Sequence, residues 1–102
     1  MAMTTAQARD TFGTFSGNMN DCDWQINGEW GHTFISRRDE AIYLVHGFAD
    51  ATTAYQVTAE VAKKFDRIIR KVYDAMECRQ DVAKLVTDLT KLVHRSGLRP
   101  VA

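Results

Sequence analysis

Five residues of this sequence carry side chains used in metal binding and nucleophilic catalysis: Cys22, His32, His46, Cys78 and His94. A structural metal site needs cysteine and histidine at close, recurring spacings such as C-x-x-C or H-x-x-x-H, and these residues show none. Catalysis by a cysteine needs a histidine base in contact with it, which no spacing here predicts. We therefore expect no metal, no cofactor and no enzymatic activity.

The composition is that of a soluble globular protein. The chain has 102 residues, of which 45% are apolar and 25% charged, so residues 1–102 should form a single domain. The longest apolar run covers only residues 41–45, and the first residues do not resemble a signal peptide, so we expect no membrane association and a cytoplasmic location. The two cysteines are too few and too distant for a disulfide framework, which favours free thiols.

Charge is distributed unevenly although the net charge is zero. Residues 1–50 hold three basic and seven acidic residues, a net charge of −4, and residues 51–102 hold ten basic and six acidic residues, a net charge of +4. Such a dipolar chain can steer a partner electrostatically, without indicating what that partner is.

The first half of the chain predicts antiparallel strands. Asn27-Gly28 is a strong two-residue hairpin signal because both turn positions need a positive φ. This turn pairs Trp24 with Gly31 and Asp23 with His32. A second turn within residues 36–41 is expected to place Ser36 opposite Ala41 and Ile35 opposite Ile42, and a further short strand is expected at residues 10–16.

Alternation along these strands divides their side chains between two faces. One face gathers core residues: Cys22, Trp24, Ile26, Ile35, Ile42, Leu44 and Phe48, with His46 as a polar exception. The opposite face is also apolar and aromatic: Trp30, Phe34, Tyr43 and Val45, with His32 among them. This second face could be covered by the N-terminal segment, which has Phe12, Phe15 and Met19, by a second copy of the chain, or by another protein.

The second half predicts two helices, at residues 54–77 and 80–96. The first is expected to begin at a capping box formed by Thr53 and Gln56. The apolar stripes of the two segments are rotated by about 100° relative to each other, so one straight helix cannot point both at a single core. We expect a break between Glu77 and Asp81, with one long helix as the alternative. The fold class is then α+β: a small antiparallel sheet of three to four strands within residues 11–48, packed on one face by two C-terminal helices.

The aromatic face suggests protein binding. We expect a small non-enzymatic module, an inhibitor or accessory protein, that occludes a partner through Trp30, His32, Phe34, Tyr43 and Val45. The partner is another protein or a second copy in a homodimer. Small size and the absence of motifs also suit the inhibitors that phages and mobile elements carry against host defence, including anti-CRISPR-like proteins.

The alternative is a nucleic-acid-associated module. Four basic residues of the first predicted helix lie away from its apolar stripe: Lys63, Arg67, Arg70 and Lys71. This basic ridge is interrupted by Asp74 and belongs to a helix expected on the other side of the sheet from the aromatic residues. A solvated helix face therefore explains it better than a nucleic-acid site.

Overall fold

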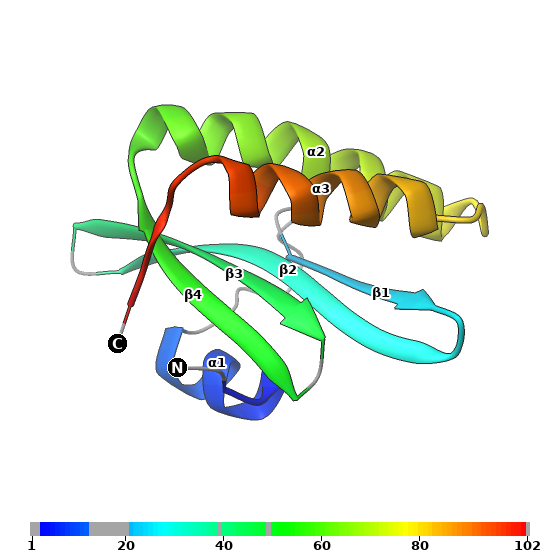
Figure 1. Ribbon diagram of the computed structural model, residues 1–102, viewed down its shortest axis with the longest axis horizontal. Helices are drawn as coiled ribbons and strands as arrows, with labels where there is room; N and C mark the ends of the chain where they lie inside the picture. The colour runs from blue at the N-terminus through cyan, green and yellow to red at the C-terminus, as the bar shows by residue number, and fades with distance from the viewer. Residues whose placement is uncertain (1–2, 13–20, 39, 49, 102) are drawn as a thin grey trace.

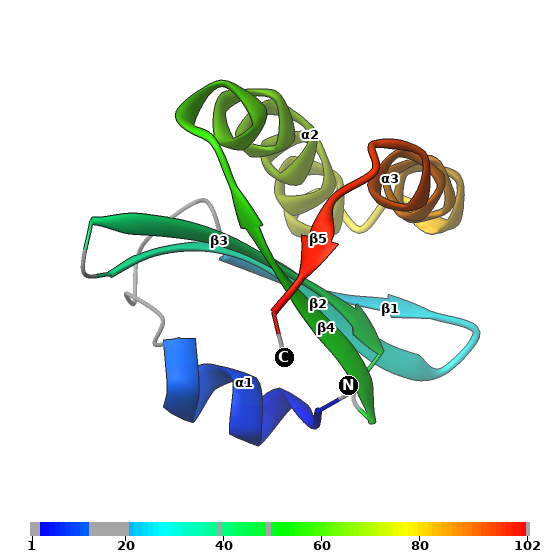
Figure 2. The ribbon, with the colours of Figure 1, turned by 60° about the vertical axis from the view of Figure 1, so that its left-hand side comes forward.

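The structure is a computed structural model that describes residues 3–12, 21–38, 40–48 and 50–101. A five-stranded antiparallel sheet lies between two helices on one face and one short helix on the other (Figures 1 and 2). The elements in chain order are α1 (Thr5–Phe12), β1 (Asp21–Ile26), β2 (Glu29–Arg38), β3 (Ala41–Phe48), β4 (Ala51–Val57), α2 (Ala59–Glu77), α3 (Ala83–Arg95) and β5 (Arg99–Pro100). The predicted α+β class is confirmed, with one strand more than the largest number expected.

The first hairpin has the predicted register. Trp24 pairs with Gly31 and Asp23 with His32, and the turn residues Asn27 and Gly28 have φ values of +52° and +83°. The second predicted register was wrong by two residues, because Ala41 pairs with Arg38 and not with Ser36. The turn is tight, with Glu40 at a φ of +65°, so both strands continue closer to it than expected. A shift of two residues preserves the face of every side chain, so the predicted division into two faces is confirmed.

The predicted helix start at Thr53 was wrong. Residues 51–57 form β4, whose partner along its whole length is β3. Helix α2 begins after Thr58, whose hydroxyl accepts from the Val61 backbone N–H at 3.2 Å. The β-branched residues of this segment favour a strand, and pairing with β3 satisfies its backbone hydrogen-bonding groups. Together these two effects outweigh the local capping signal at Thr53.

The predicted break between the two C-terminal helices is confirmed. The backbone N–H of Gln80 donates to Ala75 O at 2.8 Å, and that of Arg79 donates to Met76 O at 3.0 Å. This is the Schellman pattern that ends many helices, and Arg79 takes the left-handed conformation, with φ at +55°, where glycine is usual. Because no glycine or proline lies between Glu77 and Asp81, the sequence has no residue there that usually signals the end of a helix.

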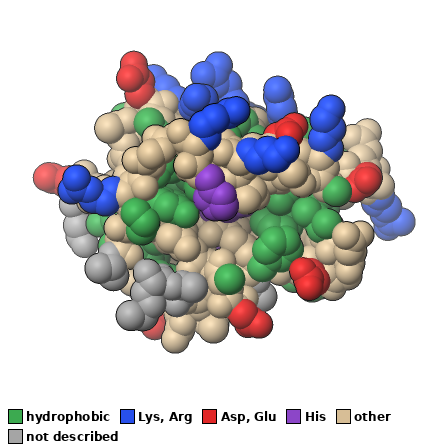
Figure 3. All heavy atoms as spheres, viewed as in Figure 1, with side chains coloured by type: hydrophobic (Ala, Val, Ile, Leu, Met, Phe, Trp, Pro, Cys, Tyr) green, Lys and Arg blue, Asp and Glu red, His purple; other side chains and the backbone are tan. Residues whose placement is uncertain are grey.

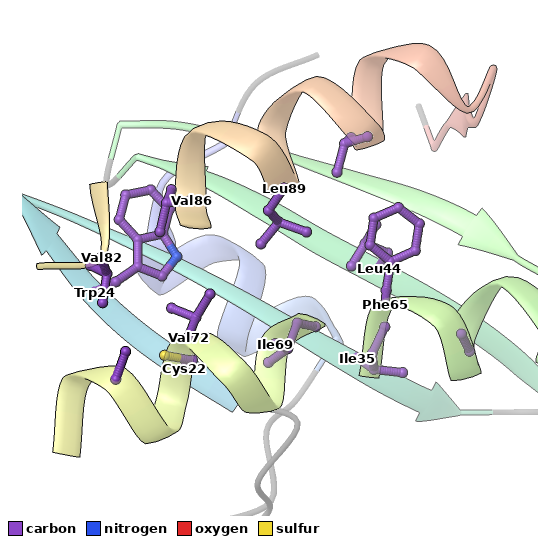
Figure 4. Close-up of a cluster of buried hydrophobic side chains, with 13 residues drawn as sticks. Cys22, Trp24, Ile35, Leu44, Phe65, Ile69, Val72, Val82, Val86 and Leu89 are labelled. Carbon is purple, nitrogen blue, oxygen red and sulfur yellow. The ribbon is translucent and has the colours of Figure 1, made fainter. Parts of the chain in front are cut away.

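The main core lies between the sheet and the helix pair α2–α3 (Figure 4). Trp24, Phe65, Ile69 and Leu89 are fully buried there, and Figure 4 shows the Trp24 ring beside Val82 and Val86. The buried positions of α2 recur every three or four residues: Ala62, Phe65, Ile69, Val72 and Ala75. This is the apolar stripe that the sequence predicted.

Helix α1 covers the opposite face of the sheet, as Figure 2 shows. The strand predicted at residues 10–16 was wrong for residues 10–12, which belong to α1, while residues 13–16 lie outside the described residues. The helix begins with a reciprocal capping box, in which Thr4 N–H donates to Gln7 Oε1 at 2.9 Å and Gln7 N–H donates to Thr4 Oγ1 at 3.1 Å. The Thr-x-x-Gln pattern therefore caps a helix here and not at Thr53.

Candidate protein-binding surface

The five predicted binding residues divide into a covered group and an exposed tryptophan. His32, Phe34 and Val45 are buried, Tyr43 is half-buried, and Trp30 is 54% exposed. Ala8 and Phe12 of α1 pack against Phe34 and Val45. Of the three ways of covering this face, the structure shows the one supplied by the N-terminal segment.

Specific contacts hold α1 in this position. The Phe12 ring lies 5.0 Å from the Tyr43 ring, centroid to centroid, and the Ser36 hydroxyl donates to the Phe12 carbonyl. At the other end of the segment, Met3 and Thr52 exchange two backbone hydrogen bonds of 2.8 and 2.9 Å. Phe34 and Val45 are therefore part of the protein's own interior in this structure.

The two buried histidines lie on opposite faces of the sheet, as predicted. His32 stacks on Phe34, with ring centroids 5.9 Å apart, and its Nε2 is 3.0 Å from Thr52 Oγ1. Because the Thr52 hydroxyl donates to Phe48 O, its oxygen is left to accept from His32. His32 is therefore tied to β4 from the α1 side of the sheet.

His46 belongs to a hydrogen-bonded chain on the α2–α3 side. Trp24 Nε1 donates to Thr33 Oγ1 at 3.0 Å, and this hydroxyl lies 2.8 Å from His46 Nδ1. His46 Nε2 lies 2.9 Å from Thr90 Oγ1, whose hydroxyl donates to Val86 O. Because the Thr90 proton is committed to Val86 O, Nε2 carries the histidine proton and Nδ1 accepts from Thr33.

This arrangement suits a neutral imidazole. Burial is the main cause that lowers the pKa of His46 to about 4, and the electrostatic influence of His32 and His94 acts in the same direction. A neutral histidine with both nitrogens hydrogen-bonded links the sheet to α3. His46 is therefore best explained as a structural residue.

Trp30 is the most exposed large hydrophobic residue of the described chain, followed by Phe48 at 40%. It lies at the junction of three hollows, one beside His32 and Gly31, one against the C-terminal end of α2, and one beside Phe48. The second hollow has a volume of about 630 Å³ and is lined also by Tyr73 and Met76. We call this region the Trp30 surface; it comprises Trp30 and Phe48 with the charged residues Asp23, Glu29, Asp50, Glu77 and Arg79.

The Trp30 surface lies at the end of the sheet where the β1–β2 hairpin reaches past the β3–β4 turn (Figure 1). Figure 3 shows hydrophobic side chains exposed below the helices on the hairpin side, with acidic side chains beside them. The Glu77 carboxylate, which hydrogen-bonds Tyr73, is the main cause that raises the pKa of the Tyr73 hydroxyl above its usual 10.0. Glu77 thus places a carboxylate directly beside Tyr73 at this surface.

The basic ridge lies elsewhere. Lys63, Arg67, Arg70 and Lys71 are all exposed on α2, on the side of the helix away from its buried stripe. Figure 3 shows Lys and Arg side chains gathered along the helix side of the molecule. None of these four basic residues is among the described residues that line the three hollows at Trp30.

The remaining chemical candidates are separate. Cys22 is buried and Cys78 exposed, and the structure places no disulfide between these two residues. Within the described ranges, no group of three or more His, Cys, Asp or Glu side chains is placed to hold a metal ion. In the same part of the chain, none of the helices has both the length and the apolar character that crossing a bilayer requires.

Comparisons with protein families, with curated proteins and with solved structures give no significant match to this chain. Sequence reasoning identified Trp30 but missed the residues that surround it. Phe48 was assigned to the core face, and Glu29, Asp50 and Glu77 come from the start of β2, the β3–β4 turn and the end of α2. Their proximity depends on how the hairpins and α2 pack, which no local pattern encodes.

Proposed function

We propose that this protein is a small non-enzymatic binding module, an inhibitor or accessory protein, which occludes a surface of a partner protein with its Trp30 surface. The observation that carries the proposal is the 54% exposure of Trp30 in a chain whose other tryptophan is fully buried. Tryptophan is enriched among the residues that dominate binding energy at protein interfaces, and leaving it in water forgoes a large burial energy.

The geometry around Trp30 supports the same proposal. Phe48 adds a second exposed ring, and the adjoining hollows offer recesses for side chains of a partner. Charged side chains surround the two rings, which is the arrangement of an apolar centre with a polar rim. The anchors are thus Trp30 and Phe48, in place of Phe34, Tyr43 and Val45, which α1 covers wholly or in part. We also propose a cytoplasmic location, where a reducing environment keeps cysteines unbridged.

Site-specific photocrosslinking tests this proposal. A benzophenone amino acid in place of Phe48 should form a discrete adduct with one protein in cells that contain the partner. The same amino acid in place of the exposed Lys63 on α2 is the matched control and should not form that adduct. Trp30→Ala should abolish the adduct while changing the free energy of unfolding by less than about 1 kcal/mol, because the side chain is largely exposed.

Two results would count against this function. One is the absence of any adduct specific to position 48. The other is an adduct whose yield is unchanged by Trp30→Ala. Light scattering on the purified protein shows whether the partner is a second copy of the chain.

The basic ridge supports nucleic-acid binding less well. Glu60 and Asp74 fall within the same arc of α2, and Arg37 at the sheet forms an ion pair of 3.4 Å with Asp66 of this helix. Reversing Arg67 and Arg70 to glutamate should leave retention on nucleic acid at low salt unchanged. A salt-sensitive retention that this change removes would favour the alternative.

A further inference from the structure

We propose that the segment bound by the Trp30 surface is basic, and that it places an arginine or lysine side chain on the Trp30 ring between the surrounding carboxylates. This inference rests on the proposed function and specifies the chemistry of the partner.

The charges around Trp30 are mostly negative. Four exposed carboxylates line the three hollows, and they come from β1, β2, the β3–β4 turn and the end of α2: Asp23, Glu29, Asp50 and Glu77. Arg79 supplies the opposing positive charge among the residues that line them. A surface built in this way repels phosphate and attracts cations, which favours a basic polypeptide over a nucleic acid.

The ring adds a second, independent preference for a cation. The face of an indole is the best cation–π acceptor among protein side chains, and arginine uses it more often than lysine. A guanidinium stacked on Trp30 also presents its N–H groups in a plane from which neighbouring carboxylates can accept. Aromatic ring and carboxylates therefore select the same ligand chemistry.

The space beside the ring fits more than one side chain. The hollow between Trp30 and the end of α2 has a volume of about 630 Å³, with Asp23 on one wall and Glu77 on another. The Glu77 carboxylate is the main cause that raises the pKa of the neighbouring Tyr73 hydroxyl, which also lines this hollow. A basic segment of several residues is therefore a better fit than a single isolated cation.

The chain itself offers a basic segment, since α2 carries Lys63, Arg67, Arg70 and Lys71. A second copy would have to place this ridge on the Trp30 surface of the first. That contact is head-to-tail, and unless its rotation closes a ring it extends into a filament. We therefore assign the basic segment to a different protein. The experiment below also tests the alternative, in which the segment belongs to a second copy of the chain.

The experiment is an NMR titration of ¹⁵N-labelled protein with an acetylated, amidated hexa-arginine peptide, and with hexaglutamate as the control peptide. The two tryptophans give two indole N–H signals, and buried Trp24 serves as the internal control for exposed Trp30. Hexa-arginine should shift the Trp30 signal saturably and leave that of Trp24 in place. Hexaglutamate should shift neither signal.

Charge variants test whether hexa-arginine binds through the carboxylates of the Trp30 surface. Glu29→Gln with Asp50→Asn removes two carboxylates from the Trp30 surface and should weaken hexa-arginine binding at least tenfold. The matched control, Asp10→Asn with Glu60→Gln, removes two exposed carboxylates from α1 and the start of α2 and should change binding less than twofold. Arg79→Asn removes the opposing charge, suits the positive φ of this residue, and should strengthen binding several-fold.

The outcomes separate this inference from the proposed function. The inference is wrong if hexa-arginine leaves the Trp30 signal unmoved, or if both charge variants weaken binding equally. It is also wrong if the adduct formed at position 48 survives Glu29→Gln with Asp50→Asn undiminished, although the proposed function would then stand. Binding of hexa-arginine as described, without any protein adduct at position 48, would support the cation site and count against the proposed function. Self-association that Arg67→Glu abolishes would assign the basic segment to a second copy and overturn the choice of partner.

Discussion

The Trp24 ring lies directly against the backbone of Gly31, its cross-strand partner, so that a β-carbon at Gly31 would overlap the six-membered ring of the indole. The ring cannot easily withdraw, because it is fully buried and its Nε1 donates to Thr33. Glycine is required at this position by close packing, with no need for a positive φ.

Gly31→Ala should therefore destabilise the protein by about 1–3 kcal/mol, the usual cost of overpacking a rigid core. The measurement is equilibrium unfolding in urea. Trp24→Phe provides the control, because a smaller ring makes room for the added methyl group. Gly31→Ala should cost less in the Trp24→Phe background, by about 1 kcal/mol. Equal costs in the two backgrounds would show that the ring is not what excludes the β-carbon.

The pKa of His46 makes folding stability dependent on pH. The folded-state pKa of about 4 lies below the ordinary histidine value of 6.5, so the unfolded chain binds more protons between these values. Stability is therefore full above pH 6.5 and falls as the pH drops from 6.5 toward 4. From these two pKa values, His46 alone should remove about 2 kcal/mol between pH 7 and pH 5.

Urea unfolding of the wild type and His46→Gln at pH 7, 6 and 5 checks this prediction. The variant should be less stable at pH 7 and should lose less stability on acidification. The exposed His94 is the comparison variant: it is one of the smaller causes of the lowered pKa of His46, so His94→Gln should reduce the slope far less than His46→Gln does. A slope that His46→Gln leaves unchanged would assign the acid sensitivity to other groups.

Helix α1 should contribute to stability through Phe12, which is buried against Tyr43 and the Phe34–Val45 pair. Phe12→Ala should cost about 3 kcal/mol, because it leaves a cavity over the sheet. Asp10→Ala, on the exposed side of the same helix, should cost less than about 0.5 kcal/mol. Hydrogen exchange should also show faster exchange in α1 for the Phe12 variant. Equal effects of the two substitutions would mean that α1 does not depend on this contact.

The two cysteines should differ sharply in their reaction with an alkylating reagent. Cys78 is exposed at the end of α2 and should react in the native protein at the rate of an ordinary free thiol. Cys22 is buried in the main core and should react only after unfolding. Mass spectrometry of the native and urea-treated protein distinguishes the two sites. Reaction of Cys78 much faster than a free thiol would count against the non-enzymatic proposal.

Local patterns were enough for part of the fold. The Asn27-Gly28 turn and the alternation of side chains assigned every core residue of β1 to β3 to the correct face, even where the second register was off by two. Periodicity also placed the break before α3. These signals depend on neighbours within a few residues, which the sequence displays directly.

The sequence by itself thus determined an α+β domain with two apolar sheet faces. It left open which segment or partner, if any, buries Trp30. Tertiary structure decided that α1 covers Phe34 and Val45, that Thr53 belongs to a strand while Thr4 caps a helix, and that Trp30 stays exposed among carboxylates. The reason is that a Thr-x-x-Gln pattern or an aromatic stripe has the same local energetics wherever it occurs. Only packing between distant segments selects which apolar surface is buried and which is left for a partner.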